Sequence, residues 1–390
     1  MNFDPLSRYL DSLSESYGIP AADCKVTLGY ETVYRHSTGY ADAAQTRPVA
    51  PTDMYYVYSC SKVMTVTAAM QLCEQGRLSL NDRLDRYLPE FAQMEIAADF
   101  PVGKQPVRWP TRKDRLVKAK NPIRILDLFC MTAGFSYDIE SAEIQTLRQK
   151  SDNHATTREM MAAIARMPLL YEPGTRWLYS LAHDVLGAVI EVVSGETLGE
   201  YMQNHLFSPL EMEDIGFTVT PERKARLSAQ YAGDPATQQI KPFPLENHYR
   251  FSDRYESGGA GILCTVDAYS RFVEAMSNGG VGANGKRILT MASIDELRKN
   301  RLDSRMTADF SGINKTGYGY GLGVRTLLDP SVSRSPAGEF GWDGAAGAYA
   351  LIDTEHRLGI FYAEHVLSFE ENYQSIHPTI RDLVYDALEE

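Results

Sequence analysis

A serine and a lysine three residues apart could supply nucleophilic chemistry. They stand in the segment Ser59-Cys60-Ser61-Lys62, and side chains at this spacing on a helix lie on one face. A serine hydroxyl is a weak nucleophile until a neighbouring base takes its proton, and a lysine can be that base when burial lowers its pKa. The pair therefore indicates covalent acyl transfer, although the same spacing is common at helix starts that have no chemistry.

The residues around this pair predict the element that positions it. An aromatic and β-branched segment, 54–58, leads into Ser59. Apolar residues then recur at helical spacing until Gly76, at Val63, Val66, Met70 and Cys73. This pattern predicts a largely buried helix that begins near Ser59. The positive end of such a helix offers backbone N–H groups to a developing oxyanion.

Composition limits the class of protein. The chain has 390 residues, of which 44% are hydrophobic and 23% charged, as is ordinary for a globular enzyme. A net charge of -12 argues against nucleic acid as a partner. Five scattered cysteines, no run of membrane-spanning length and no leader-like amino terminus favour a cytoplasmic protein without a membrane partner. No metal-binding spacing occurs, so we predict no metal and no cofactor.

The segment after the predicted helix carries a family resemblance. Gln75-Gly76-Arg77-Leu78-Ser79-Leu80-Asn81-Asp82 resembles the segment that follows the nucleophile in serine β-lactamases and penicillin-binding-protein-like enzymes. The resemblance implies the α/β serine β-lactamase-like fold, an antiparallel sheet flanked by helices with an inserted, mostly helical lobe. It implies a single domain with an α/β lobe in 1–58 and 258–390, a helical lobe in 59–257, and an active site between them.

Enzymes of this class need a second group that shuttles a proton. One candidate matches the motif but is better explained as a structural turn. Ser151-Asp152-Asn153 matches a known motif literally. It lies just before Thr156 and Glu159, whose spacing is that of a capping box at the start of a helix. We therefore interpret the segment as a turn ahead of a surface helix.

The other candidate is Tyr179-Ser180-Leu181, which follows a turn and an aromatic stretch. This block resembles the tyrosine motif of class C β-lactamases and family VIII carboxylesterases, and a phenol can pass a proton between a lysine and a leaving group. Leu181 replaces the usual asparagine, which would orient an amide substrate. The resemblance therefore favours Tyr179 as the shuttle and an ester as the substrate.

Two segments could supply the third motif, which lies on a strand beside the nucleophile. Lys315-Thr316-Gly317 is a literal match, and the alternative is Trp342-Asp343-Gly344. In this superfamily one further strand and a terminal helix follow the motif strand, and residues 358–366 and 376–388 fit that order after Trp342. We therefore choose Trp342 and interpret Lys315 as an exposed lysine at the start of a strand over 318–324.

A tryptophan in the third motif changes the expected substrate. Family VIII carboxylesterases resemble this chain in having W-x-G there. Trp342 offers an uncharged, apolar wall where a lysine would hold a carboxylate, so we expect a neutral acyl group. Asp343 could repel anions, and Gly344 and Ala345 follow it in the motif.

Three further features receive structural interpretations. The glycine-rich segment Ser257–Gly261 is expected to pack closely near the pocket, and Cys60 to be a buried filler. The basic stretch 104–124 is interpreted as a solvated surface excursion, with an anion-attracting rim or a partner interface as the alternative. A homo-oligomer is left open.

Together the motifs predict a serine hydrolase that forms an acyl-enzyme on small, mostly neutral esters. Lys62, assisted by Tyr179, would take the proton of Ser59, and the backbone amides of Ser59 and Ala345 would hold the oxyanion. The predicted substrate-binding residues are Trp342, Asp343 and Gly344. The alternatives are an amide-directed relative (a β-lactamase, a D-amino-acid peptidase or amidase, or an acyltransferase) and a weakly catalytic scaffold of the same fold.

Overall fold

An antiparallel sheet joins segments from both ends of the chain. The computed structural model describes residues 1–99, 107–234, 236–237, 239–313 and 315–389. Its seven-stranded sheet has the order β10-β11-β12-β13-β14-β1-β2, and every neighbouring pair is antiparallel. The strands are β1 (Ala21–Leu28), β2 (Glu31–Gly39), β10 (Tyr318–Tyr320), β11 (Arg325–Leu327), β12 (Phe340–Asp343), β13 (Tyr349–Asp353) and β14 (Leu358–Ala363).

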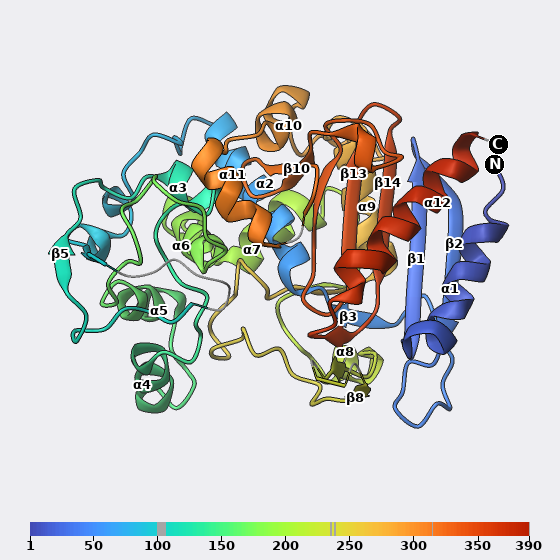
Figure 1. Ribbon diagram of the computed structural model, residues 1–390, viewed down its shortest axis with the longest axis horizontal. Helices are drawn as coiled ribbons and strands as arrows, with labels where there is room; N and C mark the ends of the chain where they lie inside the picture. Colours follow the sequence, from blue (N-terminus) through green and yellow to red (C-terminus); the bar gives the residue numbers. More distant parts are fainter. Residues whose placement is uncertain (100–106, 235, 238, 314, 390) are drawn as a thin grey trace.

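Helices cover both faces of this sheet (Figure 1). The helices α1 (Asp4–Tyr17) and α12 (His377–Glu389) pack on one face, and α9 (Val266–Ser277) packs on the other. Ile360 of β14 belongs to the core under α1 and α12, whereas its neighbour Phe361 belongs to the core that includes α9. Successive side chains of a strand point to opposite faces, so a strand covered on both faces is apolar throughout.

A mostly helical region lies beside the sheet (Figure 1). Its central helix is α2, in which nearly every residue from Ser61 to Leu72 is fully buried, and a helix apolar all round is a core helix. It contacts α6, α7 and β12. The helices here are α2 (Ser61–Glu74), α3 (Ile125–Phe129), α4 (Ala142–Lys150), α5 (Thr157–Ile164), α6 (Ala182–Ser194), α7 (Leu198–Met202), α10 (Met291–Arg298) and α11 (Ser304–Phe310). The helix α8 (Pro221–Arg226) lies apart from them, near β3 and β8.

Short strands connect the two regions. One small sheet has the order β3-β9-β6 and another has the order β15-β7-β8, whereas β4 and β5 pair with each other within the helical region. These strands are β3 (Met54–Tyr56), β4 (Glu95–Ala97), β5 (Leu116–Lys118), β6 (Ile215–Gly216), β7 (Tyr231–Gly233), β8 (Ile240–Pro242), β9 (Leu263–Thr265) and β15 (Val366–Leu367). The helical lobe that we propose, residues 59–257, thus includes strands that pair with segments outside it.

The predicted fold class is confirmed, with one local error. The strand expected over 318–324 ends at Tyr320, and the chain turns before β11 begins at Arg325. Gly323 has a φ of 87° in this turn, and a Cβ there would stand 2.3 Å from Val66 Cγ1, so the turn packs directly on α2. Within the described residues, no helix is long and apolar enough to cross a membrane.

Candidate active site

Ser59 lies in a short 3-10 turn immediately before α2. The preceding residue, Tyr58, has a φ of 43°, which is rare for a bulky side chain and is maintained only where the surroundings require it. The Tyr58 phenol is fully buried and donates a hydrogen bond to Gln230 Oε1 at 2.7 Å. This anchor fixes the backbone that presents Ser59, whose side chain remains near the surface of a cavity.

Lys62 contacts Ser59 in an environment that excludes solvent. Its Nζ is 3.2 Å from Ser59 Oγ and donates to the Gly259 carbonyl at 2.6 Å. Complete burial lowers the pKa of Lys62 to about 7, although the Asp184 carboxylate opposes this shift. An appreciable fraction of the amine is therefore neutral near pH 7 and able to accept a proton.

The glycine-rich segment packs closely beside this lysine, as predicted. A Cβ on Gly259 would stand 2.4 Å from Asp184 Oδ2, and one on Gly258 would stand 2.5 Å from the His183 carbonyl. Only a glycine backbone can approach so closely. The segment therefore brings a carbonyl to Lys62, which orients the amine toward Ser59.

The pH dependence of turnover should reflect Lys62. We expect kcat/KM for a neutral ester to rise with pH through about 7 and then level off, because the neutral amine is the base. The measurement is an initial-rate profile from about two units below to about two units above that value. Since Asp184 raises the pKa of Lys62, Asp184→Asn should move the rise to lower pH. A rise near the ordinary pKa of lysine would contradict this assignment.

The Tyr179 phenol lies between Trp342 and Ser59. Trp342 Nε1 donates to Tyr179 Oη at 3.0 Å, and the two rings stack with centroids 5.5 Å apart. Burial raises the pKa of Tyr179 well above its usual value, against the opposing hydrogen bonds of Ser59 and Trp342. The Lys62 amine stands 4.7 Å from the Tyr179 ring centroid. The structure thus brings together the hydroxyl, the amine and the phenol singled out in the sequence.

A second tyrosine, Tyr137, reaches the same amine and was missed from the sequence. Its Oη lies 3.1 Å from Lys62 Nζ, and its ring stacks on Tyr179 with centroids 5.3 Å apart. The chain has 23 tyrosines, so residue type alone could not single it out. Its position in the fold makes Tyr137 a second phenol able to exchange protons with Lys62.

Removing each hydroxyl should separate the roles of the two phenols. Tyr179→Phe should lower kcat by about 100-fold, the usual contribution of a positioned acid or base. Tyr137→Phe should lower kcat less and shift the pH profile, because it changes the hydrogen bonding of Lys62. Tyr320→Phe is the matched control: its ring packs on Trp342, and its hydroxyl has no hydrogen-bond partner within the described residues. Equal losses in all three variants would contradict these roles.

Gly344 allows the third motif to approach the nucleophile. A Cβ there would stand 2.5 Å from the Val57 carbonyl, two residues before Ser59. The hairpin after β12 is closed by a hydrogen bond from the Gly344 amide to the Ala348 carbonyl at 2.7 Å. As a result Ala345 lines the same cavity as Ser59, where its amide could serve as the second oxyanion donor.

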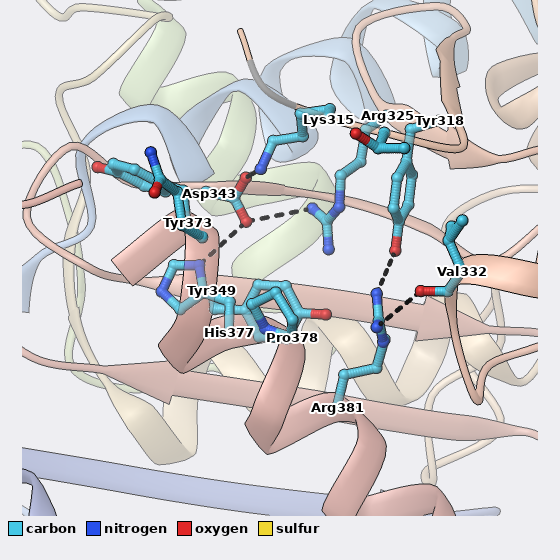
Figure 2. Close-up of a pocket in the computed structure, with 12 residues that line it drawn as sticks. Lys315, Tyr318, Arg325, Val332, Asp343, Tyr349, Tyr373, His377, Pro378 and Arg381 are labelled. Atoms are coloured by element: carbon cyan, nitrogen blue, oxygen red, sulfur yellow. Dashed lines mark hydrogen bonds and ion pairs between the residues drawn. The ribbon is translucent and has the colours of Figure 1, made fainter. Parts of the chain in front are cut away.

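The prediction that Lys315 is an exposed surface residue is wrong. Its side chain is 13% exposed and its Nζ forms an ion pair with Asp343, which lies inside the site (Figure 2). Arg325 Nη1 is 3.6 Å from the same carboxylate. The strand pattern around Lys315 could not show that Asp343, at the end of β12, is buried opposite it.

These cations also correct the expectation that Asp343 repels anions. Burial would raise the pKa of Asp343, but the charges of Lys315 and Arg325 hold it well below its usual range. Asp343 is therefore ionised beside two basic side chains, Lys315 and Arg325. An anion near this carboxylate would also meet the two cations.

The cavity in front of Ser59 is mainly aromatic. It has a volume of about 410 Å³. Its lining consists of Ser59, Tyr137, Tyr179, Tyr249, Ile313, Lys315, Trp342, Asp343, Ala345 and Tyr373. All predicted site residues are in this set except Lys62, which lies behind the rings, and Gly344, which forms the turn. No three His, Cys, Asp or Glu side chains in the described part of the chain are grouped so as to hold a metal ion.

The Ser151-Asp152-Asn153 motif belongs to a turn. Asp152 and Asn153 have left-handed φ values of 50° and 57° after α4, and neither lines the cavity. Thr156 and Glu159 form the expected capping box at the start of α5. Short polar residues tolerate this backbone conformation well, so their types are explained without catalysis.

Cys60 is a buried filler, as predicted. Burial raises the pKa of its thiol well above the usual value, and the Sγ donates to the Trp342 carbonyl at 3.4 Å. A thiol in this state is a poor nucleophile.

Much of the basic stretch is paired on the surface. Lys104 lies outside the described residues. Arg108 pairs with Asp114, and Arg115 with Asp99. Such exposed pairs fit a solvated excursion.

Comparison with known proteins agrees with this geometry. The sequence matches the Beta-lactamase family over residues 6–384, so the chain belongs to that family. Esterase EstB from Burkholderia gladioli is 28% identical over 381 residues, which cover 91% of this chain and 88% of EstB. The solved structure of EstCE1, a hydrolase with promiscuous acyltransferase activity, superposes with a TM-score of 0.78 and 25% identity over 97% of each chain.

A family VIII carboxylesterase structure shares the fold, with a TM-score of 0.69 and 20% identity over 93% of this chain and 91% of that one. The resemblance found in the sequence is therefore confirmed. The chain has relatives among the esterases and acyltransferases of the serine β-lactamase fold.

Proposed function

We propose that the protein hydrolyses esters through a covalent acyl-enzyme on Ser59. The observation that supports this proposal is the contact between the Ser59 hydroxyl and the buried amine of Lys62, which lie 3.2 Å apart. The Tyr179 phenol lies beside both groups. This is the arrangement that an activated serine nucleophile needs.

The reaction proceeds in two steps. Neutral Lys62, with Tyr179, accepts the proton of Ser59 as its Oγ attacks the ester carbonyl. The amides of Ser59 and Ala345 stabilise the oxyanion. Collapse breaks the bond to the alcohol, which leaves with a proton from Tyr179, and water then releases the acid by the same route.

Two features favour an ester with an uncharged reacting portion over an amide. Trp342 presents an apolar ring where a lysine would hold a carboxylate next to the reacting bond. Leu181 is fully buried in the core and is outside the set of described residues that line the cavity. The position that would orient an amide therefore supplies no polar group. The esterase relative EstB supports the same choice.

A substrate panel tests this function. We expect hydrolysis of p-nitrophenyl butyrate to exceed that of nitrocefin and of a D-alanyl-D-alanine peptide by orders of magnitude in kcat/KM. Faster cleavage of either amide would favour the amide-directed relatives. Product analysis with an added alcohol separates hydrolysis from acyl transfer. No turnover and no labelling by a fluorophosphonate would favour a scaffold, because a scaffold has no reason to keep Ser59 activated.

The cellular location and assembly remain predictions. The five cysteines are all free thiols, which is the state expected in a reducing cytoplasm. A homo-oligomer would be detected by light scattering of the purified protein.

A further inference from the structure

A second cavity adjoins the one in front of Ser59, and Figure 2 shows residues that line this second cavity. The two share three wall residues, Lys315, Asp343 and Tyr373. The second cavity has a volume of about 290 Å³ and is mainly polar. We call it the cationic cavity because three cations line it, contributed by the loop before β10, by β11 and by α12: Lys315, Arg325 and Arg381.

The cations of this cavity outnumber its acids. Asp343 is the single carboxylate among the described residues that line it, so the two arginines alone outnumber it, even though burial lowers the pKa of Lys315. Arg325 and Arg381 are only 2% and 5% exposed. Buried charges are poorly screened by salt and water, so an unbalanced surplus favours an anion from outside the chain.

One buried guanidinium has spare hydrogen-bonding capacity. Arg325 Nη2 donates to the Ala350 carbonyl at 3.1 Å. Its Nη1 has no hydrogen-bond partner within the described residues and only approaches Asp343, at 3.6 Å. A buried donor without a partner is costly, and a ligand oxygen would satisfy it.

Two acids lie just outside the lining, and one of them, Asp382, pairs with Arg381. Asp382 accepts from Arg381 Nε at 2.8 Å, while the Nη1 edge of that guanidinium donates to Tyr318 Oη at 3.1 Å within the cavity (Figure 2). Glu339 lies behind Tyr318, and its burial raises its pKa despite the nearby Arg325.

We propose that the cationic cavity binds a carboxylate at the far end of an ester whose scissile carbonyl lies at Ser59. The preferred substrates are then esters with an apolar, uncharged reacting portion and a distant carboxylate, such as monoesters of short dicarboxylic acids. The inference rests on the proposed function. The carboxylate takes no part in the chemistry: Ser59 Oγ gains the acyl group, the alcohol leaves with the serine proton, and the distant charge only orients the substrate. Both cavities are then occupied by one molecule.

A binding experiment tests the cationic cavity without turnover. The ligand is monomethyl glutarate, the protein is the Ser59→Ala variant, and the neutral control is the corresponding monoamide methyl ester. We expect the carboxylate to bind at least about tenfold more tightly than the amide by calorimetry, because charge-assisted hydrogen bonds are the stronger ones. In the same background, Arg381→Gln should remove that difference. Arg334→Gln removes an arginine that pairs with Asp386 on α12 outside the cavity, and should preserve it.

A kinetic experiment decides whether the acyl part or the alcohol part of the ester carries the carboxylate. The first arm of the experiment tests the acyl part and compares p-nitrophenyl monoesters of succinate, glutarate and adipate with neutral acyl esters of equal length. The second arm tests the alcohol part and compares 4-acetoxybenzoate with its amide. A preference for the anion that is lost in Arg381→Gln in either arm supports the proposal. Equal kcat/KM for anionic and neutral esters in both arms, together with equal binding, overturns it. If neutral esters are still cleaved through Ser59, the proposed function survives that result. If Ser59→Ala leaves turnover intact, the proposed function itself fails.

Discussion

Ser59→Ala is expected to lower kcat/KM for p-nitrophenyl butyrate by about 10⁴-fold or more, because no other serine, threonine or cysteine among the described residues lines the cavity. Cys60, the adjacent candidate, is buried with a raised pKa and donates to the Trp342 carbonyl. The loss should occur without a loss of folding, since alanine fits where the small Ser59 side chain lines an open cavity. Initial rates and a thermal melt of the same preparation measure both quantities.

The matched control for this variant is Cys60→Ala. It alters the neighbouring position without removing the hydroxyl, so its turnover should stay close to that of the parent protein. If Ser59→Ala kept near-normal turnover, or if Cys60→Ala lost as much activity as Ser59→Ala, the nucleophile would lie elsewhere.

Lys62→Met should have the second largest effect, a loss of about 10³-fold or more in kcat. Methionine has a similar length but cannot accept the proton of Ser59, so the hydroxyl stays a weak nucleophile. The same change should leave the protein folded, with a melting temperature close to that of the parent. Methionine removes the cost of burying a charged amine, but it also leaves the Gly259 carbonyl without its donor, and the two effects oppose each other.

The combination of lost activity and retained stability separates catalysis from packing. A lysine that only supported the fold would give a less stable protein on substitution, with activity falling in proportion to the folded fraction. Near-normal turnover in Lys62→Met would show that another group activates Ser59.

The site residues that could be predicted from the sequence are those placed by helical spacing or by the order of elements along the chain. Ser59 and Lys62 are one helical turn apart, so their proximity follows from the start of α2 alone. Tyr179 and Trp342 were placed by their order along the chain and by the elements that follow them. These elements formed close to the expected positions, with α6 after Tyr179, and β14 and α12 after Trp342.

The parts that could not be predicted are contacts between distant segments. Tyr137 is 75 residues from Lys62, and nothing around it indicates that its loop passes the amine. Lys315 was misjudged because its local pattern is that of a surface strand, whereas its partner Asp343 belongs to another strand of the sheet. The left-handed backbone of Tyr58 depends on Gln230, again a distant residue.

The most direct test of the central claim is the rate at which a fluorophosphonate modifies the protein as a function of pH, with the modified peptide identified by mass spectrometry. The account predicts a single adduct on Ser59, a rate that rises through a pH of about 7, and no adduct in Lys62→Met. An adduct on a different residue, or a rate that rises only near the ordinary pKa of lysine, would contradict it.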